Sequence, residues 1–141
     1  MQLLFKKLDP QAKSPTKGNP GDAGIDLYAN EEIIFQPGEQ KRIHTGIAME
    51  IPSGYVGLIW DKSGISFKQG LKIVGGVIDC GYRGEIIASM VNLSNETQTI
   101  SQGQKFTQII IQKFEDCILQ EVESLSDSER GEGREGSTGI H

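Results

Sequence analysis

Residues 41–60 read KRIHTGIAMEIPSGYVGLIW, and this stretch decides the fold class. It contains three short segments rich in apolar and β-branched residues, Lys41–Thr45, Ile47–Ile51 and Tyr55–Trp60. The last two are separated by Pro52-Ser53-Gly54, a combination typical of turns because proline restricts φ and glycine adopts positive φ without steric cost. Short segments of this composition between turn residues predict β-strands.

The same pattern continues on both sides of this stretch. Short apolar segments recur at intervals of about ten residues, which is typical of an all-β sandwich or barrel. No stretch of about 12 residues keeps an apolar period of 3.6, so we expect no long helix, although the sequence leaves room for a short one at Ser63–Gln69. The other predicted strands are Gln2–Leu8, Gly24–Ala29, Glu32–Gln36, Leu71–Val74, Glu85–Val91, Gln98–Ser101, Lys105–Lys113 and Ile118–Leu125.

The character of the chain changes after Leu125. Residues 131–139 hold four glycines and no apolar residue, so this segment cannot bury enough surface to order itself. We expect one β domain over residues 1–125 and a flexible arm over residues 126–141. The arm is either a frayed terminus or a segment that orders over a ligand. The second interpretation rests on the phosphate-binding donors of Arg130, Arg134, Ser137 and Thr138.

Composition and charge exclude several classes of protein. The net charge of −5 argues against broad nucleic-acid binding, which requires a basic surface. The two cysteines, Cys80 and Cys117, are isolated and predict reduced thiols rather than a zinc site. No window approaches the roughly 20 apolar residues of a membrane helix, so we expect a cytoplasmic protein without a membrane partner. The hydrophobic content of 36% is low, which fits a subunit that shares buried surface with identical copies.

Residues 75–85, GGVIDCGYRGE, combine glycines, a carboxylate, an aromatic ring and a cation. Here Asp79 could act as a general base for water and Tyr82 could form a wall for a sugar ring. The alternative is a β-hairpin in which Asp79 only fixes the turn. Residues 61–66, DKSGIS, suit an anion cradle, or else form a solvated turn.

Five segments, in this order, resemble the five motifs of the trimeric dUTPase family. They are Ala23–Ala29, Lys62–Gly64, Gly76–Asp79 with Tyr82–Gly84, Gly103–Ile110, and Arg130-Gly131 with Gly136–Gly139. The resemblance implies a jelly-roll-like β fold and a homotrimer with active sites at subunit boundaries. It also implies hydrolysis of dUTP to dUMP and pyrophosphate with Mg²⁺, which keeps uracil out of DNA and supplies dUMP for dTMP synthesis.

The resemblance further implies a role for each matching residue. Asp79 corresponds to the general base that activates the attacking water, and Asp26 to the residue that helps hold Mg²⁺ through its water shell. Tyr82 corresponds to the aromatic residue that packs against deoxyribose, and a hairpin from Ile73 to Val77 to the uracil pocket. The remaining substrate-binding positions are Lys62, Ser63, Gly64, Gly76, Val77, Ile78, Gln108, Arg130, Gly136, Ser137 and Thr138.

Two alternatives from other functional classes remain. A dCTP deaminase shares the fold but carries a glutamate on the strand after the third motif, where this chain has Ser89. A catalytically weak relative that serves as a binding or regulatory module is favoured only by Glu135, which stands where relatives carry an aromatic residue.

The arm departs from the family pattern at Arg134 and Glu135, where relatives have a small residue followed by an aromatic one. A carboxylate cannot stack on a uracil ring and is repelled by a triphosphate, so we expect a raised KM or a lowered kcat. Restoring the aromatic residue in Glu135→Phe should therefore increase kcat/KM for dUTP in a steady-state assay. An unchanged or lower kcat/KM would contradict this interpretation of the arm.

Overall fold

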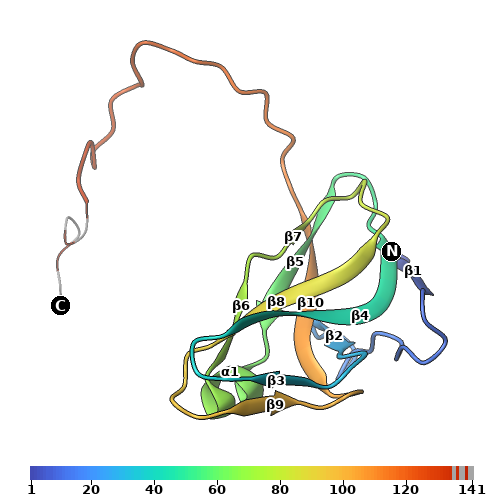
Figure 1. The fold of residues 1–141 in the computed structure, drawn as a ribbon. Helices are drawn as coiled ribbons and strands as arrows, with labels where there is room; N and C mark the ends of the chain where they lie inside the picture. Colours follow the sequence, from blue (N-terminus) through green and yellow to red (C-terminus); the bar gives the residue numbers. More distant parts are fainter. Residues whose placement is uncertain (135, 137–138, 140–141) are drawn as a thin grey trace.

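The computed structural model describes residues 1–134, 136 and 139, and within them the chain is built almost entirely of β-strands (Figure 1). The elements in chain order are β1 (Leu4–Lys7), β2 (Ile25–Tyr28), β3 (Ile33–Phe35), β4 (Gln40–Glu50), β5 (Tyr55–Asp61), α1 (Ser63–Gln69), β6 (Leu71–Val74), β7 (Val77–Ile78), β8 (Glu85–Asn92), β9 (Gln98–Ile100) and β10 (Lys105–Lys113).

The strands form two larger sheets and one small one. The first sheet has the order β1-β4-β8-β6, the second has the order β2-β10-β5-β7, and β3 pairs with β9. All the strand pairs are antiparallel. Neighbours in each sheet are distant in sequence, as expected of a jelly-roll-like fold, and the all-β prediction is confirmed.

The core lies between the two larger sheets and follows from the alternation of side chains along each strand. In β8, Ile86, Ala88 and Met90 are buried while the residues between them are only partly covered. Phe106 and Ile109 of β10 contribute to the same cluster from the other sheet and are fully buried. Burial of aliphatic and aromatic side chains on both inner faces holds the sheets together.

Three expectations from the sequence need correction. The segments Lys41–Thr45 and Ile47–Ile51 form one strand, β4, which continues through Gly46 because this glycine adopts a positive φ of 67°. The segment Ile118–Leu125 is not a strand, and Ile118 is 97% exposed. An apolar run alone does not make a strand when no edge lies beside it to supply hydrogen bonds.

The expected hairpin over Ile73 to Val77 is also wrong. In this part of the chain β6 pairs with β8 in the first sheet, whereas β7 pairs with β5 in the second. The chain crosses from one sheet to the other at Gly75 and Gly76, both of which have positive φ. Glycine tolerates this backbone conformation, which L side chains rarely adopt.

The short helix allowed by the sequence is present as α1, at the bounds expected. It ends at Gly70, whose left-handed backbone donates its N–H to the Ser66 carbonyl. No helix in the described part of the chain has the length and apolar character needed to cross a membrane. After β10, the chain runs away from the sheets as an extended segment (Figure 1).

Candidate active site

The first candidate cavity collects residues from three of the predicted motifs. Asp26 of β2 lies directly opposite Gln108 of β10 in the strand register, and Lys62 follows β5 on the other side of β10. These side chains line one polar cavity together with Gly18, Asp22, Ala23 and Gly24. The structure thus brings together residues that are more than 80 positions apart in the sequence.

A buried carboxylate lies at the centre of this cavity. The Asp26 side chain is only 5% exposed, and its two oxygens are paired with the ammonium groups of Lys62, at 2.6 Å, and Lys105, at 3.1 Å. Burial alone would raise the pKa of Asp26, but the hydrogen bonds and charges of the two lysines outweigh it and keep the pKa below its usual value. Asp26 is therefore ionised at neutral pH, and the three groups together retain one net positive charge.

Gln108 is fixed by a contact that requires a glycine on the neighbouring strand. Its side-chain nitrogen donates to the Asp61 carbonyl at 2.8 Å, and its side chain passes over Gly24. A Cβ atom at Gly24 would lie 1.9 Å from the Gln108 Oε1 atom, far inside van der Waals contact. A side chain at position 24 would therefore displace the Gln108 side chain, and the sequence alone did not reveal this role of Gly24.

The second candidate cavity contains the proposed base and the proposed sugar platform. Asp79 and Tyr82 line it with Val77 and Ile78 of β7, and Glu85 and Ile87 complete its wall. Asp79 is exposed, and its backbone carbonyl accepts a hydrogen bond from the Tyr82 N–H that closes the turn. The turn thus brings Asp79 and Tyr82 to the wall of one cavity, and the hydrogen bond that closes it involves the Asp79 backbone.

Gly76 lies in a neighbouring hollow rather than in the second cavity itself. This hollow is lined by Ile59, Trp60, Ile73 and Val77, among others, and Val77 also belongs to the second cavity. The Gly76 carbonyl accepts a hydrogen bond from the Ile59 N–H at 2.8 Å. A side chain at Gly76 would come within 2.9 Å of the Ile59 carbonyl oxygen, so only glycine fits.

The two cavities have no lining residue in common, so one chain does not bring all the predicted residues together. Ser63 and Gly64 are exposed at the start of α1, next to Lys62. Arg130 and Gly136 belong to the segment after β10, where the Arg130 side chain donates to the Gly133 carbonyl. Glu135, Ser137 and Thr138 lie outside the described residues.

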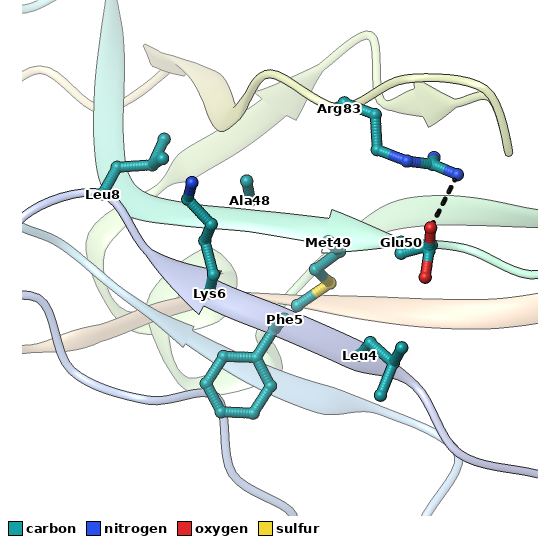
Figure 2. A pocket seen from close by; sticks show the side chains of 8 residues that line it. All are labelled: Leu4, Phe5, Lys6, Leu8, Ala48, Met49, Glu50 and Arg83. Atoms are coloured by element: carbon teal, nitrogen blue, oxygen red, sulfur yellow. Dashed lines mark hydrogen bonds and ion pairs between the residues drawn. The ribbon is translucent and has the colours of Figure 1, made fainter.

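A further hollow contains none of the predicted site residues. Figure 2 shows it over β1 and β4, lined mainly by apolar side chains such as Leu4, Phe5 and Met49. An ion pair between Arg83 and Glu50, at 3.1 Å, lies at one end. Its carboxylate, Glu50, is already paired with Arg83, and none of the predicted site residues lines it, so we do not consider it part of the active site.

Sequence reasoning missed Lys105 as a site residue. Strict alternation places residues 105 and 108 on opposite faces of a strand, because their separation is odd. The pairing of β10 with β2 shifts register between Lys105 and Thr107, and this irregularity allows Lys105 and Gln108 both to face Asp26. The only signal in the sequence was the presence of Lys105 inside the fourth motif.

The class that these observations define is an all-β protein with two small cavities, one holding a carboxylate paired with two lysines and the other lined by Asp79 and Tyr82. Comparison with known proteins identifies the family, because the dUTPase family profile matches residues 10–139. The chain belongs to the dUTPase family. It is accordingly a hydrolase that acts on dUTP rather than a dCTP deaminase.

Individual relatives agree with this assignment over nearly the full chain. The deoxyuridine 5'-triphosphate nucleotidohydrolase of Rhodococcus erythropolis is 41% identical over all of this chain and 88% of its own length. That of Clostridium kluyveri is also 41% identical, over 99% of both chains.

Solved structures support the same family. The dUTPase of Staphylococcus bacteriophage 80alpha with dUPNHPP has a TM-score of 0.92 and 30% identity, and the match covers 99% of both chains. A variant dUTPase from phage phi11 of S. aureus, described as coordinating a structural Mg(II) ion, has a TM-score of 0.84 and 28% identity. The match covers 90% of this chain and all of the phage phi11 chain.

The contact between Gly24 and Gln108 gives a test of the first cavity. Gly24→Ala should displace the Gln108 side chain and lower kcat/KM for dUTP by roughly tenfold or more, since one charged-group hydrogen bond is worth about 1.5–3 kcal/mol. The measurement is steady-state hydrolysis with circular dichroism to check the fold. Gly38→Ala is a matched control, because a Cβ there meets nothing within 4 Å and the positive φ only adds backbone strain. Equal losses in the two variants would show that the Gln108 contact has no specific role.

Proposed function

We propose that this chain hydrolyses dUTP to dUMP and pyrophosphate, with Mg²⁺ as cofactor, by attack of a water that Asp79 activates on the α-phosphorus. The observation that carries the proposal is the exposed Asp79 carboxylate beside the Tyr82 ring, in a cavity edged by backbone groups of β7. A general base must have access to both water and substrate, and an exposed carboxylate at the wall of an open cavity meets this requirement.

The lysine cluster of the first cavity is suited to the triphosphate. Lys62 and Lys105 balance the two carboxylates of this cavity, Asp26 and Asp22, so the cavity is locally neutral although the whole chain is acidic, and the lysine ammonium groups can bind phosphate oxygens. Ser63, Gly64 and Gln108 lie next to these lysines or line the same cavity and would donate hydrogen bonds to phosphate oxygens. In the arm, Arg130, Gly136, Ser137 and Thr138 remain proposed phosphate contacts on the basis of the motif alone.

The second cavity is suited to a deoxynucleoside. Tyr82 would pack against deoxyribose and leave no room for a ribose 2'-hydroxyl. Val77 and Ile78 would present backbone groups to the uracil edge, and Gly76, which lets this segment lie close to Ile59 of β5, would position them. Cytosine would place an amine where uracil has a carbonyl oxygen, and thymine would add a methyl group.

The first cavity also fits Mg²⁺ held through water. Mg²⁺ prefers few protein ligands, several waters and substrate phosphates. Each Asp26 oxygen accepts one lysine contact and keeps capacity for a hydrogen bond from a metal-bound water, and Asp22 adds a second carboxylate at the same cavity. When bound there, the ion would neutralise charge on the phosphates.

Replacing the proposed base tests the chemistry directly. Asp79→Asn keeps the size of the side chain but removes its proton affinity, so kcat should fall by about 10²–10⁴ while binding of a non-hydrolysable dUTP analogue persists. Products from dUTP, UTP, dTTP and dCTP should be separated by chromatography for both proteins. The wild-type enzyme should form dUMP and pyrophosphate from dUTP alone. An Asp79→Asn variant with full activity would exclude Asp79 as the base.

We also propose a homotrimer in which neighbouring subunits complete each active site. The two cavities measure about 180 and 270 Å³, and each is smaller than the roughly 300–1,000 Å³ typical of ligand sites. Large apolar side chains are also exposed in the single chain, both over β1 and after β10, which is typical of surfaces that other copies cover. They include Leu4, Phe5, Leu8, Ile118, Leu119 and Leu125.

Sedimentation equilibrium should therefore give a mass three times that of the 15.4 kDa chain. A chain truncated after Leu125 should still sediment at three times its own, smaller mass but lose turnover, if residues 126–141 act as an arm that closes over the site. A monomer with full activity would contradict the shared site, because each cavity would then have to serve alone.

This activity has a plain metabolic consequence. Removing dUTP keeps uracil out of DNA, and its product dUMP is the precursor for dTMP. A cytoplasmic location, close to the nucleotide pool that supplies DNA synthesis, fits this role and remains part of the proposal.

A further inference from the structure

Glu85 contacts the Tyr82 turn through its backbone and strand β4 through its side chain. Its backbone carbonyl accepts a hydrogen bond of 2.8 Å from the Tyr82 hydroxyl. Its carboxylate accepts the Gly46 N–H at 2.8 Å and lies 2.8 Å from the His44 Nδ1 atom. Glu85 accordingly lines the second cavity on one side and a polar cavity containing His44 on the other.

The Glu85 carboxylate accepts a hydrogen bond where the pairing of β4 with β8 is interrupted. His44 pairs with Ile87 and Ala48 pairs with Glu85, so three residues of β4 lie opposite the single residue between them in β8. The ladder cannot satisfy all the backbone groups of such a bulge. Gly46 is buried there, and a buried N–H without a partner is costly. Glu85 supplies that partner from the neighbouring strand.

Tyr82 depends on the start of β8 for its orientation. The residue is 43% exposed, so packing in the core does not fix the ring. The hydroxyl is held by the Glu85 carbonyl, and the ring covers Gly84, where a Cβ atom would lie 2.5 Å from the Tyr82 hydroxyl oxygen. The position of the ring therefore follows the position of the Glu85 backbone.

We propose that Glu85 is a positioning residue that sets sugar specificity through Tyr82. The Glu85 carboxylate is anchored to the Gly46 N–H in the β4 bulge, and this contact fixes the Glu85 backbone. The Glu85 carbonyl in turn fixes the position of the Tyr82 ring in the cavity through the Tyr82 hydroxyl. If the Tyr82 ring is free to shift, the second cavity gains space for the 2'-hydroxyl of a ribonucleotide. The inference rests on the proposed role of Tyr82 as the deoxyribose platform, and it adds a residue that acts through Tyr82.

The test compares Glu85→Ala with Glu85→Gln in the full-length protein, with dUTP and UTP as substrates. Glu85→Ala leaves the buried Gly46 N–H unpaired and releases the start of β8, so the preference for dUTP over UTP in kcat/KM should fall several-fold. The loss should appear mainly as a raised KM for dUTP, with kcat changed less, because Asp79 is not displaced. Glu85→Gln should restore most of the preference, since its amide oxygen still accepts the Gly46 N–H.

Two controls separate this role from a general loss of stability. Arg42→Ala removes an exposed charged side chain from the same strand pair, where Arg42 lies opposite Ser89, and should leave the dUTP preference unchanged. In a Tyr82→Phe background, which lacks the hydroxyl contact, Glu85→Ala should produce little further loss of preference. If Glu85→Ala does not fold, Glu85→Asp provides a milder change, because its carboxylate lies one methylene farther from the Gly46 N–H. The dUTP preference of Glu85→Asp should then fall in the same direction but by a smaller factor.

The outcomes are distinct. A wild-type protein without dUTP hydrolysis would overturn the proposed function, and the inference with it. An active wild type whose Glu85→Ala variant keeps its dUTP preference, or loses it additively with Tyr82→Phe, would overturn the positioning role alone. A drop in melting temperature with unchanged preference would likewise leave Glu85 a purely structural residue.

Discussion

The pairing of one buried carboxylate with two lysines is the constraint on which the first half of the site depends. Asp26 is nearly inaccessible to solvent, and an unpaired charge at such a position would be costly. Lys62 and Lys105 supply the compensation, and they come from the end of β5 and from β10. The same contacts therefore join three segments of one sheet. The two lysines that compensate Asp26 are also the cations that the proposed function assigns to the substrate phosphates.

The second half of the site depends on backbone geometry rather than on charge. The glycines at 75 and 76 let the chain pass from one sheet to the other, and the short β7 that follows displays its backbone at the edge of a cavity. Asp79 and Tyr82 are placed by the turn after β7. The two cavities share no lining residue. Their different character matches the proposed substrate, which has a nucleoside at one end and phosphates at the other.

Much of the fold could be predicted from local sequence, because alternation and turn residues act over a few positions. The buried face of β8 and the short helix α1 follow directly from such patterns. The pairing of β6 and β7 with different sheets could not be predicted, since it depends on partners far away in the chain. Ile118–Leu125 shows the converse limit, because its apolar residues find no partner strand in the described chain.

For the site, motif resemblance located Asp26, Asp79 and Tyr82, but it did not reveal the second lysine on Asp26 or the steric role of Gly24. Both depend on how side chains face one another across a strand pair. Such relations are fixed by register, which short-range periodicity does not encode where a strand is irregular.

The register shift in β10 gives this strand one residue more than regular alternation would need. Phe106 and Thr107 are consecutive and both buried, so the strand does not alternate at this point. Removing one of the two would leave Lys105 and Gln108 an even number of positions apart, and regular alternation would still place both on the face of Asp26. The deletion would instead take a buried side chain out of the core, so its cost would fall on stability and not on the arrangement of charges around Asp26. Homologues could therefore lose this irregularity without moving Lys105, provided that the core beside β10 is repacked.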